Sequence, residues 1–144
     1  MSLNSTEFSS LKQYIQAYDK IKVERCDLEK QLIELSLSYV DDHQYDFICL
    51  IYNRDDEKDR VYIKVSGIGK LKETTLESLD KLNDFNDISG TKIYLDENHD
   101  LVLTTSATTQ MLDDEKNEWI LRNFMYAVTK ASLARKDLWE YIKK

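Results

Sequence analysis

The chain has 144 residues, of which 42% are hydrophobic and 33% charged, and its formal net charge is −7. This length suits one domain with one core, and the balance of apolar and charged residues is typical of a folded chain. The negative charge disfavours nucleic acid and anionic lipid as partners, because the basic residues are scattered among acidic neighbours rather than gathered into a stripe.

The sequence has no apolar run of the roughly 18 to 20 residues that a membrane span requires, and its first residues lack the pattern of a secretory signal. We therefore expect a cytoplasmic protein without membrane contact. No linker or repeat interrupts the chain, so residues 1–144 are predicted to form a single domain, with residues 1–6 disordered or a remnant of cloning. Of the two cysteines, Cys26 and Cys49, the second lies in an apolar run and is expected to be a buried, inert thiol.

The first predicted helix covers about Phe8 to Tyr18, where apolar residues recur at steps of three and four. Ser5 or Thr6 is its expected N-cap. Residues 21–34 give a mixed pattern, and extended and helical interpretations both stay open for them.

Three strands are predicted next, because the apolar period changes to two. The first begins at Leu35. The second covers residues 47–52, and apolar side chains on both of its faces predict a central strand covered on both sides. The third has Val61, Ile63 and Val65 on one face, and the three strands should form an antiparallel meander.

A second helix is predicted after Thr74, which has the spacing of a capping box with Glu77. Its expected buried side consists of Leu76, Leu79, Leu82 and Phe85. A hairpin follows, in which Ile93 and Leu95 pair with Leu101 and Leu103 across the polar turn 96–100.

The last helix is predicted over about residues 113–141, with acidic residues at its start and lysines at its end. One apolar stripe runs along it and is the candidate interface: Ile120, Phe124, Ala127, Ala131, Ala134 and Leu138. Two uses of this stripe are open, a dimer seam and packing on the chain's own sheet. The second is favoured, because an amphipathic helix must first cover the sheet.

Residues suited to catalysis are sparse. His43 and His99 fall in predicted turns, and neither has a second histidine or a cysteine at metal-ligand spacing. No serine lies in a nucleophile elbow, and no glycine-rich phosphate loop occurs. We therefore predict a protein that is not an enzyme, with no catalytic residue, no metal and no cofactor.

The turn at residues 96–100 matches a calcium-binding loop in part. Asp96, Asn98 and Asp100 match the first three ligand positions of a calcium-binding loop. Leu101 and Ala107 then stand where that loop needs a glycine and a bidentate glutamate. A plain hairpin turn is the better interpretation.

The elements in order are helix, three strands, helix, two strands, helix, which predicts an α+β fold with an antiparallel sheet. Three segments resemble the YbjN-like bacterial family: residues 79–83 with their leucine-asparagine pair, the hairpin 92–103, and the helix 119–133. The resemblance covers residues 76–141 well. It implies a fold like that of type III secretion chaperones, whose members are small, acidic and commonly dimeric, and which hold extended segments of partner proteins. YbjN-like proteins are generally described as regulators, and no reaction is established for them.

The leading hypothesis is a non-catalytic protein-binding module, a regulator or chaperone-like protein that binds a segment of a partner protein. A homodimer is a further expectation. One alternative is a self-associating structural domain, and another is a small-molecule sensor with a pocket under the last helix. The walls of that pocket would come from Tyr94, Trp119, Tyr126 and Trp139, although the two tryptophans lie about 30 Å apart along one helix and cannot form one box.

Overall fold

The computed structural model describes residues 4–18, 21–40, 43–54, 57–111 and 113–143, with their side chains except at positions 5, 37–40, 43–46, 57–59 and 113–114. These residues form three helices and six strands, with four strands between the first two helices and two strands between the second and the third, and a 3-10 turn follows the last helix. The elements are α1 (Ser5–Gln16), β1 (Ile21–Asp27), β2 (Leu32–Val40), β3 (His43–Arg54), β4 (Glu57–Ser66), α2 (Leu76–Ser89), β5 (Ile93–Leu95), β6 (Leu101–Thr108), α3 (Asp113–Asp137) and η1 (Trp139–Tyr141). The predicted α+β class is confirmed.

The six described strands form one sheet in the order β1-β2-β3-β4-β6-β5, and every neighbouring pair is antiparallel. The predicted meander and the predicted hairpin are both present. The predicted order was wrong by one strand, because β1 occupies part of the segment whose pattern was mixed. In β1 the register shifts between Val23 and Arg25, so Cys26 rather than Arg25 packs against the core. This bulge breaks the alternation that would have marked a strand.

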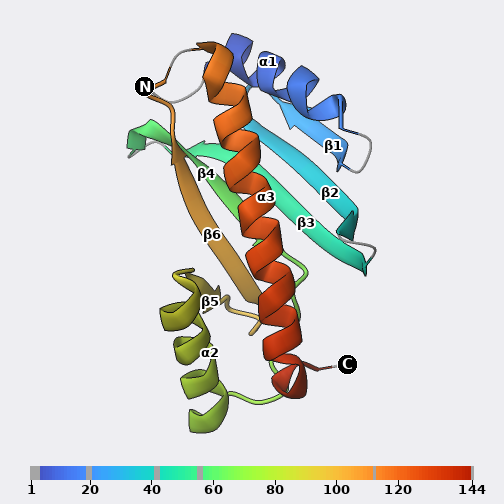
Figure 1. The fold of residues 1–144 in the computed structure, drawn as a ribbon, viewed down its shortest axis with the longest axis vertical. Coiled ribbons are helices and arrows are strands. Elements are labelled where there is room, and N and C mark those ends of the chain that lie inside the picture. Colours follow the sequence, from blue (N-terminus) through green and yellow to red (C-terminus); the bar gives the residue numbers. More distant parts are fainter. Residues whose placement is uncertain (1–3, 19–20, 41–42, 55–56, 112, 144) are drawn as a thin grey trace.

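Two helices cover one face of the sheet (Figure 1). Helix α1 lies over β1 and β2, and α3 crosses β4 and β6. Between the helices and the sheet lies a continuous core, to which the buried faces of the central strands contribute Ile33, Leu35, Phe47, Cys49, Ile51, Val61, Ile63 and Val65. Helix α2 stands apart, beside β5 at the other end of the sheet from α1.

The opposite face of the sheet is not covered by the helices. Strand β3 shows this, because Cys49 is buried while Ile48 is 52% exposed, and Leu50 and Tyr52 are half-buried. The prediction that β3 is covered on both sides was therefore wrong. Its second face is apolar, but α1 and α3 both pack on the first.

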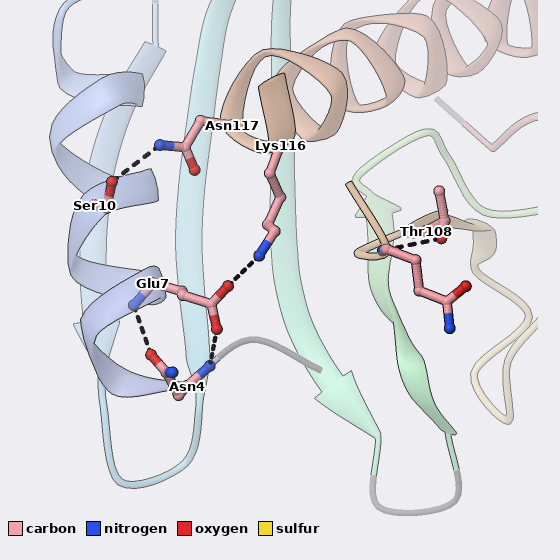
Figure 2. Close-up of polar contacts among 7 residues, drawn as sticks. Asn4, Glu7, Ser10, Thr108, Lys116 and Asn117 are labelled. Atoms are coloured by element: carbon pink, nitrogen blue, oxygen red, sulfur yellow. Dashed lines mark hydrogen bonds and ion pairs between the residues drawn. The ribbon is translucent and has the colours of Figure 1, made fainter. Parts of the chain in front are cut away.

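The N-cap of helix α1 lies one residue before the first of the two predicted caps. Asn4 is its N-cap: the Asn4 side chain accepts from the Glu7 backbone N–H at 2.9 Å, and the Glu7 carboxylate accepts from the Asn4 N–H at 3.2 Å. Figure 2 shows both bonds. The expected cap at Ser5 or Thr6 was wrong, because the reciprocal pair needs a side chain three residues before the glutamate.

Glu7 also joins α1 to α3. The Lys116 ammonium group, which is 8% exposed, bonds to the Glu7 carboxylate, and Asn117 donates to the Ser10 hydroxyl at 3.0 Å (Figure 2). The two helices that cover the sheet are thus held to each other by polar contacts as well as by the core.

Helix α2 starts one residue later than predicted. Thr75 is the N-cap and Ser78 its reciprocal partner, in place of Thr74 and Glu77. Ser78, Leu82 and Phe85 are the buried residues of this helix, whereas Leu76 is 77% exposed and Leu79 is half-buried. The expected buried side was therefore correct only in its second half, because α2 touches the rest of the molecule mainly through that half.

The residues that follow α3 are hydrogen-bonded to the loop after β4. The Lys72 N–H donates to the Tyr141 carbonyl at 2.9 Å and the Lys143 N–H to the Lys70 carbonyl at 2.6 Å. Gly69 has φ +149°, and a Cβ there would lie 2.7 Å from Cγ2 of Ile142. Glycine is needed at this position both for its backbone angle and for the close approach of Ile142.

Candidate functional site

The six residues of the candidate interface stripe all lie in the core. Their exposed fractions are 2% or less, and they pack between α3 and the sheet. The residues are Ile120, Phe124, Ala127, Ala131, Ala134 and Leu138. Side chains packed in this way offer no surface to a second copy unless the core opens.

The four aromatic residues of the pocket hypothesis are not brought together. Trp119 and Trp139 lie at opposite ends of the helical C-terminal segment, and Tyr126 and Tyr94 line different hollows. All four are exposed. The predicted pocket under α3 is therefore not formed by these residues, because the sheet itself fills the space beneath the helix.

The turn between β5 and β6 is organised by its own backbone. The Asp96 carboxylate accepts from the N–H groups of Asn98 at 2.8 Å and Asp100 at 3.0 Å. His99 is exposed in this turn at φ +63°, and its Nδ1 lies 3.4 Å from the Thr74 hydroxyl. The side chain of His43 lies outside the described residues. Within the described part of the chain, no group of three His, Cys, Asp or Glu residues could hold a metal ion.

Both cysteines are free thiols. Cys49 is fully buried in β3, and burial raises the pKa of its thiol to about 12. A thiol with so high a pKa is a poor nucleophile at neutral pH, since the thiolate is the reactive form.

The uncovered side of the sheet carries a set of exposed and half-buried side chains that we call the open face. Cross-strand partners line up in rows across it: Tyr52 pairs with Tyr62, which pairs with Ser106, and in the next row Leu50 pairs with Lys64, which pairs with Thr104. The open face comprises Ile48, Leu50, Tyr52, Tyr62, Lys64, Tyr94, Thr104 and Ser106. Rows of this kind place aromatic, apolar and hydroxyl groups side by side on a flat surface.

A hollow of about 490 Å³ lies on this face, and we call it the tyrosine groove. It is lined by Tyr52, Arg54, Tyr62, Lys92, Tyr94, Thr104, Thr105 and Ser106. The ring centroids of Tyr52 and Tyr62 are 6.0 Å apart, and the Arg54 guanidinium lies 4.8 Å from the Tyr62 ring. Burial raises the pKa of the Tyr52 phenol, so its hydroxyl stays protonated well above neutral pH.

The uncovered side of the sheet also carries charges beyond the residues of the open face. On β1 and β2 they are paired, because Lys22 lies 3.6 Å from Glu24, and Arg25 lies 3.5 Å from Glu34. The Ser36 hydroxyl donates to Glu24 at 2.7 Å, and this bond lowers the pKa of the Glu24 carboxyl. The positive and negative charges of these residues on β1 and β2 therefore compensate one another.

Three basic residues with described side chains lie on β4 and just before β5: Arg60, Lys64 and Lys92. The Arg60 Nε donates to the Ser106 hydroxyl at 3.2 Å. Neither Lys64 nor Lys92 makes an ion pair within the described residues. None of the residues that line the tyrosine groove carries a carboxylate. Lys92 in the lining of the tyrosine groove and Lys64 in the neighbouring cross-strand row are thus basic groups without an ion pair among the described residues, in a protein whose net charge is −7.

The two edges of the sheet differ. At β5 the Asn86 side chain bonds to both backbone groups of Ile93, donating to the carbonyl and accepting from the N–H, each at 2.9 Å. This closes the edge at that residue. The other edge is β1, which has a bulge and an exposed ion pair, features that hinder pairing with another strand.

A second, smaller hollow of about 240 Å³ separates α2 from α3, and it is lined by Lys81, Asp84, Phe85, Ile88, Ser89, Lys130, Leu133 and Asp137. Its lining includes the apolar residues Phe85, Ile88 and Leu133, of which Ile88 is 89% exposed. The charges around it are of both signs. It therefore shows less preference for one kind of partner than the tyrosine groove does.

No family model matches the chain, and no curated protein matches it. Its fold is similar to that of an uncharacterized protein from Methanothermobacter thermautotrophicus, with a TM-score of 0.62, 12% identity, and coverage of 95% of this chain and 99% of the other. It is also similar to a chain in the crystal structure of the ExsC–ExsE complex, with a TM-score of 0.59, 13% identity, and coverage of 94% and 96%. At these identities the likeness shows the fold alone.

The likeness to a chain of the ExsC–ExsE complex agrees with the secretion-chaperone-like fold predicted from the resemblance. The YbjN-like resemblance itself stays a prediction from the sequence. No helix described by the structure is long and apolar enough to cross a membrane.

The alternation of residues in the sequence indicates part of the open face. Tyr62 and Lys64 alternate with buried valine and isoleucine, which marks one side of β4 as partly exposed. Ile48 and Tyr52 on the neighbouring strand were expected to be covered. Their exposure became clear only once α1 and α3 were located on the same face.

Proposed function

We propose that this chain is a non-catalytic protein-binding module that holds an extended segment of a partner protein on the open face of its sheet. The observation that carries the proposal is a group of apolar and aromatic side chains on the open face: Ile48 is exposed, and the exposed Tyr94 lines the tyrosine groove with the half-buried Tyr52 and Tyr62. Aromatic and apolar side chains that are grouped on a protein surface mark contact sites, and tyrosine in particular is enriched at interfaces.

Two further points support a protein partner. A chain of the same fold occurs in the ExsC–ExsE complex, where it is crystallised with a partner protein. The resemblance to the YbjN-like family, in turn, implies a regulatory or chaperone-like effect of binding.

An extended segment fits this surface better than a second folded domain. The tyrosine groove has the volume of a few side chains, and cross-strand rows of the open face alternate apolar with polar groups. A peptide in β conformation presents alternate side chains to one surface and can match such rows.

A homodimer is the further expectation that the resemblance carries. Two open faces packed against each other would bring Lys64 and Lys92 of both copies into one interface, and like charges gathered there oppose such contact. We therefore place any self-association on another surface. Light scattering of Lys64→Glu and the wild type across one dilution series should give the same masses.

The test of the proposed function is a comparison of two tyrosine variants as bait in extract of the source organism. Tyr62→Ser removes a ring from the groove, and Tyr18→Ser removes an exposed ring just beyond α1. We expect a partner that the wild type and Tyr18→Ser capture equally to be depleted about tenfold with Tyr62→Ser, since hot-spot aromatic residues contribute energies of this order.

Circular dichroism of both variants checks that each is folded. If every captured protein is recovered equally with the two variants, the open face is not the binding surface. The same conclusion would follow if Tyr18→Ser caused the larger loss.

A further inference from the structure

We propose that the segment bound in the tyrosine groove is acidic, with carboxylates that face the lysines of the open face and apolar side chains between them. This inference rests on the proposed function and adds the chemistry of the partner. It is drawn from the charge, the spacing and the accessibility of the groove.

The first step is the sign of the charge. Arg54 and Lys92 line the groove, while Arg60 and Lys64 stand on the strand that runs through it. Lys64 and Lys92 have no carboxylate partner within the described residues. Basic residues that stay unpaired in an acidic protein create a local positive potential, which attracts an acidic ligand and repels a basic one.

Asp96 and Asp100 are acidic residues of the turn between β5 and β6. They line a neighbouring hollow together with Lys64 and Lys70. The Asp96 carboxylate is already engaged by two backbone N–H groups of its turn. It shapes the hairpin, and the charge of the groove remains positive.

The second step is spacing. In the sheet register Lys64 lies between Leu50 on β3 and Thr104 on β6, so charged, apolar and hydroxyl groups are interleaved across the strands. Along β4, Tyr62 and Lys64 lie two residues apart on the same face, at roughly 6.6 Å, which is also the spacing of side chains on one face of an extended peptide. A segment that interleaves Asp or Glu with apolar residues therefore matches the surface.

The ring contacts in the tyrosine groove favour a peptide over a single-stranded nucleic acid as the ligand. Proteins that bind single strands stack bases on free aromatic ring faces. Here the Arg54 guanidinium covers the Tyr62 ring at 4.8 Å, and the Tyr52 ring is tilted by 31° against it at 6.0 Å. The phenol, threonine and serine hydroxyl groups of the groove remain suited to hydrogen bonds with carboxylates.

The experiment is a selection from a pool of random displayed peptides about 12 residues long, which is the length of β3, the longest strand of the described sheet. The full chain is the bait, as wild type, as Lys64→Glu with Lys92→Glu, and as a control with Lys136→Glu and Lys143→Glu. Lys136 and Lys143 are exposed near the C-terminal end of α3 and beyond it, so the control has the same net charge as the groove variant.

We expect peptides enriched on the wild type to contain more Asp and Glu than the starting pool, and the control to select the same peptides. A synthetic peptide of the consensus should bind the groove variant at least about tenfold more weakly than the control, and its affinity should fall as salt rises.

Several outcomes would overturn the inference: enriched peptides that are neutral or basic, no enrichment at all, or equal loss of binding in the groove variant and the control. Competition by an oligouridine RNA at lower concentration than the peptide would assign the groove to nucleic acid. If acidic peptides fail while Tyr62→Ser still loses its cellular partner, the proposed function stands and only the acidic chemistry is wrong.

Discussion

Cys49 illustrates how burial alone sets the chemistry of a side chain. Its thiol lies on the helix-covered face of β3, opposite Leu35 and Val65 on the flanking strands. Burial raises the pKa of this thiol to about 12 from an ordinary value of 9.0. The group is therefore a small apolar core residue at physiological pH, and it takes no part in the proposed binding.

Stability should depend on this thiol in alkaline solution. Because the folded pKa lies above the unfolded one, the contribution is fully present below about pH 9 and is lost as the pH rises toward about 12. In that window the unfolded chain has released the proton and the folded chain has kept it. The slope is on the order of 1 kcal/mol per pH unit.

Urea unfolding of the wild type and of Cys49→Val between about pH 8 and about pH 11 measures this effect. Lysines and tyrosines titrate in both proteins, so the difference between the two free energies isolates the thiol. We expect the difference to shift in favour of the variant as the pH rises. A difference that is constant with pH would contradict the assigned burial.

Edge strand β5 shows how one side chain completes an element. The strand has three residues, Ile93–Leu95, and Asn86 of α2 supplies the hydrogen bonds that a further strand would make at Ile93. The amide of an asparagine carries a donor and an acceptor side by side, as a peptide group does. The Asn86 side chain therefore ends the sheet at Ile93 and joins α2 to β5 by hydrogen bonds.

We expect Asn86→Ala to lower the free energy of unfolding by roughly 1 to 3 kcal/mol, because it leaves both backbone groups of Ile93 without their partner. Asn83→Ala is the matched control, since Asn83 is exposed on the same helix. Urea unfolding gives the energies, and hydrogen exchange at the Ile93 amide should accelerate only in Asn86→Ala. Equal effects of the two substitutions would show that the bonds to Ile93 contribute little.

Periodicity predicted most elements, and its failures have physical causes. Alternation identified β3, β4 and the β5–β6 hairpin, since a half-buried strand must alternate. It failed for β1, where the bulge after Val23 changes which side chains face the core. Both helix starts were displaced by one residue or more, because a cap depends on the backbone angles of its residue as well as on its chemistry.

The whole molecule has one core. A single cluster of buried residues includes side chains from α1, from every strand, from α2 and from α3. We therefore expect the predicted single domain to unfold in one cooperative transition.

Two single-tryptophan variants test this expectation. Trp139→Phe leaves Trp119 on α3 as the reporter, near the end that contacts α1, and Trp119→Phe leaves Trp139 near the opposite end. The urea midpoints from fluorescence should coincide with each other and with the midpoint from circular dichroism for each variant. Separate midpoints would divide the molecule into two units.

The sequence alone could not predict the candidate site, because the site depends on how the whole chain folds. The open face joins side chains from β3, β4, β6 and β5, and its exposure depends on where two distant helices pack. Local patterns report which residues share a face of one strand. They do not report which face the helices will cover.

The order of the elements has a consequence for biosynthesis. All six described strands precede α3, yet α3 covers the centre of their buried face. A ribosome adds roughly 5 to 20 residues per second, so a growing chain has for some seconds a complete set of strands with Ile63, Leu103 and their neighbours unshielded. During that interval the nascent protein is itself an aggregation-prone client for cellular folding factors, until its last helix emerges from the exit tunnel.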